Sequence, residues 1–427
     1  MVGIPPWHGD RVRRRRRRLA NIAVPLASRP YRVFLTAELI SSAGGAVAPI
    51  ALAFSILQIG GRGSGIAVVL GGEFVVYLVL LPVTGVIADR TAGVGVLVVS
   101  QVIAAAFQMA EALLIISGTA RVWSLAVVAG GGAGAAALFT PAGRRVLPIL
   151  VPAGQLDRAN ALSQAGKHGL ATIGPVAGGI LVTTVGPGWG IAWDSVTFVV
   201  AAVLFSRLPR LPALPDHHRR RWDRRWAGEL ADGVRALTGR TWLWTTTLAD
   251  CLSGGAFAAA MLIGPLYARQ YLHGAISWGA IAGGLAGGSA LGGIMATAWT
   301  MRRPGIVISV GSAAMCVGPA AMATGMPLPL IMAGTLVAGI AFAPAAVARA
   351  TVVQQHVPGH RLGRVSAYQE FAASVPIPIA YALAGVTADR LGARIVIGAC
   401  AAIIAVAGLT PLAVRDVRRL AFAGVDR

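Results

Sequence analysis

Charged and aromatic residues are scarce in this sequence. Only 12% of the 427 residues are charged and 6% are aromatic, whereas 56% are hydrophobic and the mean hydropathy is +0.71. A water-soluble domain of this length is not expected to combine these values. The scarcity of charge therefore excludes a soluble globular protein and indicates a chain whose solvent is lipid.

Potential metal ligands and nucleotide-binding sequences are also missing. The three cysteines, Cys251, Cys316 and Cys400, each lie in an apolar run, which argues against a disulfide framework and a CxxC metal site. The seven histidines show no HExxH or similar spacing, and no GxxxxGK[ST] sequence is present. We therefore expect no metal, no cofactor and no ATP-driven pumping by this chain alone.

Acidic residues are outnumbered by basic ones, 16 to 37, and the formal net charge is +21. Such a charge favours nucleic-acid binding in a soluble protein. Here, however, the positive charge lies in short segments between apolar runs, as the positive-inside rule expects. Only the N-terminal run of Arg11 and Arg13 to Arg18 is typical of a nucleic-acid or anionic-lipid patch. We expect this run to contact anionic lipids and not nucleic acid.

Long apolar runs dominate what remains. A helix needs about 20 largely apolar residues to cross a bilayer. Suitable runs lie at about 33–58, 64–87, 96–118, 122–140, 164–186, 188–206, 242–266, 276–300, 304–323, 327–348, 368–388 and 394–413. The 55 glycines suit close packing of membrane helices. The sequence thus predicts an all-α integral membrane protein with twelve transmembrane helices.

The positive charge is unevenly divided between the two sides of these helices. With the N-terminus inside, 32 of the 37 basic residues lie on the inner side, and the five others are Arg62, Arg121, Arg269, Arg390 and Arg394. This asymmetry predicts that both termini are cytoplasmic in a multi-pass protein of the plasma or inner membrane. The expected parts are a basic segment 1–30, a six-helix bundle 31–207, a cytoplasmic linker 208–240, a second bundle 241–414 and a cytoplasmic tail 415–427.

The linker has its own periodic pattern. Its apolar residues recur every three or four positions, at Trp222, Trp226, Leu230, Val234 and Leu237. This spacing predicts an interfacial amphipathic helix between the two bundles. A solvated linker with an accidental period is the alternative.

The two bundles share an internal repeat. Leu150-Val151-Pro152, Leu156, Arg158 and Ala161 match His356-Val357-Pro358, Leu362, Arg364 and Ala367 at a constant offset of 206, and the same offset carries Gly186 onto Gly392. Near the start of each half, Ala37-Glu38 resembles Ala249-Asp250 at an offset of 212. Two similar halves with a substrate site between them near the bilayer midplane are typical of one large transporter architecture.

Four segments carry a family resemblance. They are Gly85-Val86-Ile87-Ala88-Asp89-Arg90, the connection from Phe139-Thr140-Pro141-Ala142 to Ala159-Asn160-Ala161-Leu162, Gly174-Pro175-Val176-Ala177-Gly178-Gly179, and Trp193-Asp194-Ser195-Val196-Thr197-Phe198. They resemble, in turn, the GxxxDR loop after helix 2, the helix 4–5 connection, the GPxxGG bend of exporters and a segment of helix 6. On these residues the chain resembles the major facilitator superfamily, and within it the drug, macrolide and enterobactin exporter branch.

The resemblance implies twelve helices in two pseudo-symmetric six-helix bundles, the major facilitator fold. It further implies a conformational switch formed by Asp89, Arg90 and Gly85, although the basic residues that usually follow are replaced by Thr91 to Gly95. Family members often carry Gly-Asp where this chain has Gly44-Gly45, so coupling through that aspartate is not expected here.

The helix-5 glycines and proline are the second site that the resemblance implies. Gly-Pro inside a membrane helix removes a backbone hydrogen bond and permits a kink. Gly174, Pro175, Gly178 and Gly179 are therefore expected to bend helix 5 and to act as a pivot. Simple close packing is the alternative.

Five carboxylates fall inside the predicted helices, where an unpaired charge costs several kcal/mol. Each is a functional-site hypothesis. Glu73 is the first candidate for proton coupling, because it lies deepest and its helix has no basic residue to neutralise it; Glu38, Asp250 and Glu111 follow. Asp194 is interpreted as a structural hydrogen-bonding acid near the outer end of helix 6, and Lys167 as an interfacial anchor at the start of helix 5.

We expect proton-coupled efflux, by alternating access, of small amphipathic organic molecules such as drugs, antibiotics or siderophores. The alternatives are a metabolite uptake or facilitated-diffusion carrier and, from another class, a membrane-embedded enzyme or a non-transporting scaffold. No His/Asp/Ser constellation in the helices supports catalysis. The expected partners are the substrate, protons and the lipid bilayer, and the chain is expected to act as a monomer.

Overall fold

The structure is a computed structural model that describes residues 24–90, 93–209, 238–299, 301–357, 365 and 369–422. The arginine run of the N-terminal segment and the linker residues 210–237 lie outside the described residues, as do the side chains of residues 85–90. The lipid contact, the amphipathic linker helix and the switch around Asp89 therefore stay predictions.

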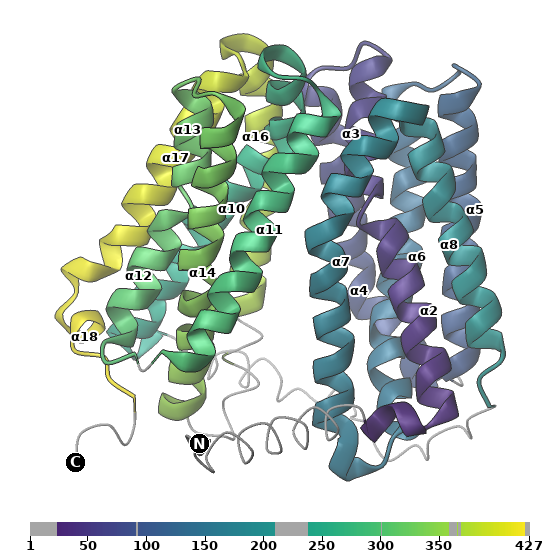
Figure 1. Cartoon of the computed structure of the whole chain (residues 1–427), viewed down its shortest axis with the longest axis horizontal. Coiled ribbons are helices and arrows are strands. Elements are labelled where there is room, and N and C mark those ends of the chain that lie inside the picture. The colour runs from purple at the N-terminus through teal and green to yellow at the C-terminus, as the bar shows by residue number, and fades with distance from the viewer. Residues whose placement is uncertain are drawn as a thin grey trace, which may run out of the picture.

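The first half of the chain forms a bundle of long helices joined by short connections (Figure 1). These elements are η1 (Val24–Ala27), α2 (Arg29–Gly45), α3 (Ala48–Gln58), α4 (Gly63–Arg90), α5 (Gly93–Ile116), α6 (Val122–Leu150), η2 (Ala153–Gln155), α7 (Leu156–Val185) and α8 (Pro187–Ser206). Both α6 and α7 extend beyond the predicted apolar runs 122–140 and 164–186. Their extra turns carry Arg144, Arg145 and Arg158, which hydropathy alone does not assign to a membrane helix.

The second half forms a similar bundle beside the first (Figure 1). Its elements are α10 (Thr241–Tyr271), α11 (Ala275–Ala298), α12 (Pro304–Ala314), α13 (Val317–Ala323), α14 (Leu328–His356), α16 (Pro376–Leu391), α17 (Ala393–Leu409), η3 (Thr410–Ala413) and α18 (Arg415–Arg418). Twelve spans among the described residues are long and apolar enough to cross a bilayer, which confirms the predicted number and the all-α class.

The internal repeat is visible in one pair of turns. Gly186 lies between α7 and α8 with φ 93° and ψ 158°, and Gly392 lies between α16 and α17 with φ 91° and ψ 154°. Residues that carry a side chain rarely adopt such positive φ values, so the backbone conformation strongly favours glycine at both positions. The residues that match at an offset of 206 therefore build the same turn in each bundle.

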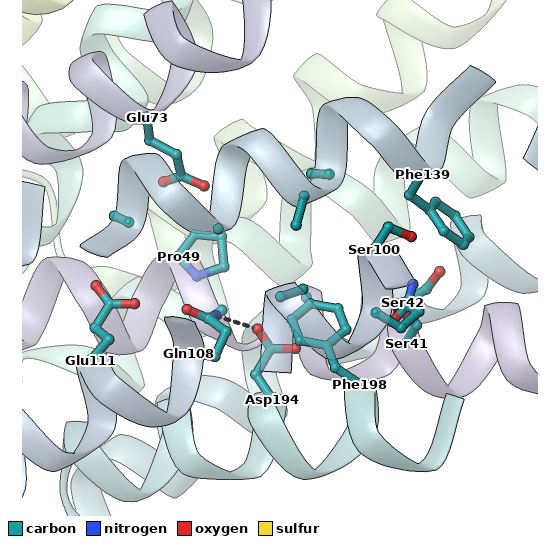
Figure 2. Close-up of a pocket in the computed structure, with 18 of the residues that line it drawn as sticks. Ser41, Ser42, Pro49, Glu73, Ser100, Gln108, Glu111, Phe139, Asp194 and Phe198 are labelled. Carbon is teal, nitrogen blue, oxygen red and sulfur yellow. Dashed lines mark hydrogen bonds between the residues drawn. The ribbon is translucent and has the colours of Figure 1, made fainter. Parts of the chain in front are cut away.

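The first membrane span is broken in two. Helix α2 ends at Gly45, and α3 begins at Ala48 with Pro49 in its first turn. A proline has no N–H to donate to the carbonyl four residues earlier, and glycine is a weak helix former, so the sequence favours a break here. Pro49 faces a cavity inside the first bundle (Figure 2).

Among the described residues, two pairs of helices make most of the contact between the bundles: α7 packs against α11, and α4 packs against α16. The contact between α7 and α11 is close enough to require glycine. A Cβ atom on Gly179 would lie 2.6 Å from the carbonyl oxygen of Ala275, and one on Gly279 would lie 2.4 Å from that of Pro175. Small residues thus let the two backbones approach, as is common between membrane helices.

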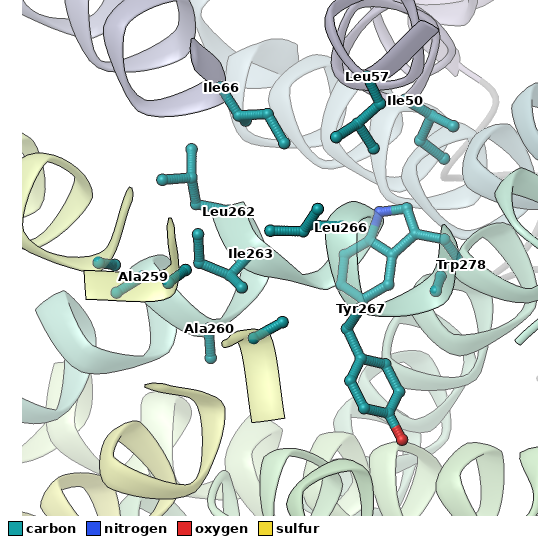
Figure 3. Packing of buried hydrophobic residues seen from close by; sticks show 14 of the residues in the cluster. Ile50, Leu57, Ile66, Ala259, Ala260, Leu262, Ile263, Leu266, Tyr267 and Trp278 are labelled. Carbon is teal, nitrogen blue, oxygen red and sulfur yellow. The ribbon is translucent and has the colours of Figure 1, made fainter. Parts of the chain in front are cut away.

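The apolar packing differs between the two ends of the molecule. We call the end with residues 24 and 422 the terminal end, and the opposite end the distal end. At the distal end one apolar cluster includes both bundles, with Ile50, Leu57 and Ile66 facing Leu262, Ile263, Leu266 and Trp278 (Figure 3). At the terminal end each described cluster belongs to one bundle, around Phe34 and Phe205 in the first and around Leu243 and Ile308 in the second. Apolar contact therefore joins the bundles at the distal end.

Candidate functional site

A cavity of about 330 Å³ lies inside the first bundle, beside the break between α2 and α3. Its walls come from α2, α3, α4, α5, α6 and α8. Leu52, Phe139 and Phe198 give it an apolar part, and serine and glutamine side chains give it a polar part. A space with both kinds of wall suits an amphipathic ligand.

Three carboxylates from three helices line this cavity: Glu73 of α4, Glu111 of α5 and Asp194 of α8 (Figure 2). Glu111 and Asp194 are each only 1% exposed, and Glu73 is half-buried. No lysine or arginine is among the described residues that line the cavity. Carboxylates without a cation in such a place are costly while ionised, so this group is suited to take up a proton or a positively charged ligand.

Asp194 is held in place by hydrogen bonds and by a glycine opposite it. Gln108 Nε2 donates to Asp194 Oδ2 at 2.5 Å, and Thr197 Oγ1 lies 3.4 Å from Oδ1. A Cβ atom on Gly44 would lie 2.2 Å from Asp194 Oδ1, whereas one on Gly45 would have nothing within 4 Å. Gly44 therefore makes room for an acid on α8, next to the place where family members often carry one on helix 1. Asp194 has the predicted hydrogen bonds but also faces the cavity.

Glu111 is the least satisfied of the three acids. Its Oε1 atom is buried and has no hydrogen-bond partner in the part of the chain that the structure describes. Buried polar atoms nearly always have a partner, so an exception beside a cavity indicates a place for a ligand or a proton. Glu111 was ranked last among the proton-coupling candidates, and its geometry gives it a stronger claim.

Glu38 and Asp250 lie in a different setting from these three. Glu38 Oε1 is 2.6 Å from Lys167 Nζ, and Asp250 forms an ion pair with Arg349. Arg349 Nη2 also donates to Ser312 Oγ at 2.9 Å. The prediction that Lys167 opens helix 5 is wrong, because α7 begins at Leu156 and Lys167 lies three turns further on, beside Glu38. Its role as an interfacial anchor stays a prediction. The repeat thus preserves the position of the acid but not the helix that supplies its cation.

The helix-5 motif packs against two neighbours. On one side, a Cβ atom on Gly174 would lie 2.3 Å from Ala46 Cβ, and one on Gly178 would lie 3.3 Å from Val47 Cα. On the other side, Pro175 and Gly179 contact α11 as described above. The motif therefore lies between the break in the first span and helix α11 of the second bundle, and it packs closely on both. Its expected role as a bend stays a prediction, as does the switch at Asp89 and Arg90 in the last turn of α4.

A whole face of α5 lines the cavity, although the sequence analysis names only Glu111 on this helix. Gln101, Ala104, Gln108 and Glu111 line the cavity from α5, at positions that recur every three or four residues. This spacing puts them on one face of a helix. A polar stripe on an otherwise apolar transmembrane helix indicates a face that lines a polar space.

Comparisons with known proteins identify the family of this chain. The sequence profile of the Major Facilitator Superfamily matches residues 34–381. The chain is 26% identical over 377 residues to the multidrug efflux pump Tap of Mycolicibacterium fortuitum, covering 85% of this chain and 90% of that protein. It is 27% identical over 407 residues to the multidrug efflux pump Tap of Mycobacterium tuberculosis strain H37Rv, covering 92% of this chain and 94% of that protein.

Solved structures show the same fold. The nucleoside transporter NupG superposes with a TM-score of 0.70 at 12% identity, covering 90% of this chain and 98% of that one. A bacterial homologue of the lysosomal transporter Spinster, in an inward-facing and unoccupied conformation, superposes with a TM-score of 0.68 at 14% identity, covering 92% and 98%. The chain therefore belongs to the Major Facilitator Superfamily, and is a multi-pass secondary transporter and not an enzyme.

Proposed function

We propose that this transporter exports small amphipathic organic molecules in exchange for protons. The observation that carries the proposal is the cavity in the first bundle, where Glu73, Glu111 and Asp194 meet beside apolar walls. The names of the two Tap relatives, multidrug efflux pumps, support the direction and the substrate class.

The exchange follows from competition for one group of carboxylates. A protonated carboxyl no longer stabilises a positive charge, and a bound organic cation no longer leaves room for the proton, so the two occupants exclude each other. Glu73 belongs to α4, which packs on the second bundle through α16, so it is the acid best placed to link occupancy to movement of the bundles. Glu111 and Asp194 are then the deeper part of the site.

The proposed topology gives the exchange a direction. With the terminal end in the cytoplasm, as the distribution of arginines favours, contact at the distal end corresponds to a state that faces the cytoplasm. A substrate enters from that side, and the bundles then rock to expose the cavity at the distal end. Protons load the carboxylates there and return with the next half-cycle.

Reconstitution in proteoliposomes tests the proposal, with the fluorescent cation ethidium as the first probe and a panel of toxic amphipathic compounds as the second. An imposed pH gradient should drive ethidium across the membrane. Glu73→Gln should retain ethidium binding and lose accumulation against a gradient. The matched control is Asp416→Asn, which removes an exposed carboxylate of α18 and should transport normally.

Two results would contradict the proposal, and a third would reassign the coupling residue. Movement of the probes only down their own gradients would favour facilitated diffusion. Movement no faster than in protein-free vesicles, together with altered lipid products, would favour an enzyme. Unchanged accumulation in Glu73→Gln would remove this residue from coupling and pass the role to Glu111, or to the Glu38 and Asp250 pairs.

A further inference from the structure

Two six-residue segments of the chain are identical at five positions. Residues 85–90 read Gly-Val-Ile-Ala-Asp-Arg and residues 385–390 read Gly-Val-Thr-Ala-Asp-Arg, 300 positions apart. The two copies end α4 and α16, the helices that pack against each other between the bundles. Because α4 runs toward the terminal end and α16 toward the distal end, the copies lie at opposite ends of the same helix pair. The repeat at an offset of 206 does not relate them.

At the distal end the second copy closes a polar contact between the bundles. The backbone N–H groups of Gly63 and Ser64 donate to Asp389 Oδ1 at 2.7 Å and to Asp389 Oδ2 at 3.1 Å. The hydroxyl group of Ser64 also donates to Asp389 Oδ2. Gly63 and Ser64 are the first residues of α4, whose N–H groups have no partner within their own helix. Asp389 therefore caps α4 from the other bundle, with its charge at the positive end of the helix dipole.

The glycine of the sequence makes this cap possible. A Cβ atom on Gly385 would lie 2.5 Å from Ala67 Cβ and 2.8 Å from the carbonyl oxygen of Gly63. Residues four apart lie on one face of a helix, so Gly385 and Asp389 face α4 together. Glycine brings the backbones into contact, and the aspartate one turn later reaches the first N–H groups of the neighbouring helix. The spacing GxxxD thus places a close backbone contact and a helix cap one turn apart where two helices cross.

We propose that Asp389 is a distal latch: it holds the distal end closed by joining α16 to the start of α4, and it must release before that end opens. A second polar contact joins the bundles at the distal end, where the guanidinium of Arg269 of α10 donates to the carbonyl oxygen of Leu57 of α3. The switch predicted for Asp89 is the counterpart of this latch at the terminal end, where the first copy of the sequence ends α4.

A charged cap suits a contact that has to open and close. When the distal end opens, water can donate hydrogen bonds to the carboxylate of Asp389 and accept them from the first N–H groups of α4. Neither partner is then left without a hydrogen bond. The adjacent apolar cluster has no such directional preference. The latch therefore fixes how the two bundles are aligned when the distal end is closed. Little free energy is needed to release it, because water replaces its hydrogen bonds.

The latch is tested by maleimide labelling of the resting protein in nanodiscs, where both ends are accessible and no substrate is needed. Two reporters are placed in a background without Cys251, Cys316 and Cys400. Leu262→Cys reports on the distal cluster, where Leu262 is 3% exposed. Thr140→Cys reports on the side of the cavity wall that faces the terminal end, because Thr140 lies in the second half of α6. Asp389→Ala should raise the labelling rate of the distal reporter by about tenfold, the size expected for a charge at a helix N-terminus.

The reciprocal change distinguishes a latch from a purely structural contact. A latch variant shifts the protein toward the distally open state, so Thr140→Cys should be labelled more slowly as Leu262→Cys is labelled faster. Asp389→Asn, which can still accept hydrogen bonds, should give an intermediate shift, and Asp416→Asn should give none. Faster labelling at both reporters would mean that the fold has loosened, and unchanged rates would mean that Asp389 does not hold the end closed; either result overturns the proposal. Because no transport is measured, the outcome is independent of the proposed substrate and coupling ion.

Discussion

The three acids that line the cavity of the first bundle differ from Asp250 of the second bundle in what faces them. In the first bundle Glu73, Glu111 and Asp194 share a cavity whose described lining has no basic residue. In the second bundle Asp250 is paired with Arg349, which Ser312 also contacts. The bundles are related by an internal repeat, yet the cavity acids of the first bundle have no described cation beside them, whereas Asp250 of the second bundle is already neutralised. A repeated backbone therefore does not imply a repeated chemistry.

The strongest way to sharpen this comparison is to break the pair in the second bundle. Asp250→Asn removes the carboxylate that faces Arg349, and the side chain of Arg349 is only 23% exposed. Leaving a largely buried charge unpaired costs about 3–5 kcal/mol, and partial exposure reduces this to about 2 kcal/mol. Thermal unfolding in detergent should show the loss. Adding Arg349→Met should recover most of it, because no charge is then left alone.

Glu73→Gln is the matched variant for that experiment. It removes a carboxylate that has no described cation nearby, so it should leave the unfolding temperature within about a degree of the native value while changing transport. A large loss of stability in Glu73→Gln, or none in Asp250→Asn, would show that the distinction between exchangeable and structural acids does not hold.

A smaller effect is expected from the two glycines at the broken span. Gly44→Ala would place a methyl group 2.2 Å from Asp194 Oδ1 and 2.9 Å from Asp194 Cα, so α2 and α8 must move apart. Overpacking of this kind costs about 1–3 kcal/mol and should also weaken transport, since it displaces a cavity acid. Gly45→Ala, with nothing within 4 Å, should fold and transport normally. Equal behaviour of the two variants would contradict the placement of Asp194.

The smallest effect is expected at the ion pair of the first bundle. The side chain of Lys167 is 38% exposed, so its pair with Glu38 is partly screened by water. Glu38→Gln leaves Lys167 without its partner, and because Lys167 is partly in water this change should lower the free energy of unfolding by less than about 1 kcal/mol. Added salt should reduce even that difference. A loss as large as that of Asp250→Asn would place the two pairs in the same class.

The sequence predicted the helices well because hydropathy is a local property. The twelve spans, the family and the equivalent turns at Gly186 and Gly392 all follow from residues close together in the chain. The meeting of Glu73, Glu111 and Asp194 could not be predicted in this way, because it depends on how α4, α5 and α8 pack side by side.

Two further residues show why local reading fails at contacts. Lys167 was assigned to the start of a helix because the apolar run begins nearby, but α7 starts earlier, in polar sequence. The contact of Asp389 could not be predicted from its neighbours in the sequence, because it is made with the first turn of a helix more than 300 residues away in the chain. The residues that flank each partner in the sequence therefore give little indication of a contact between the bundles.

The break at Gly45 and Pro49 adds a backbone contribution to the cavity. In an unbroken helix the amide of residue 49 would donate to the carbonyl group of Gly45, but proline has no hydrogen to give. This carbonyl, on a residue that lines the cavity, loses its regular donor. Its partial negative charge is independent of pH and cannot be removed by exchanging a side chain. The proline thus gives the cavity wall a backbone feature that stays the same whatever charge the three carboxylates carry.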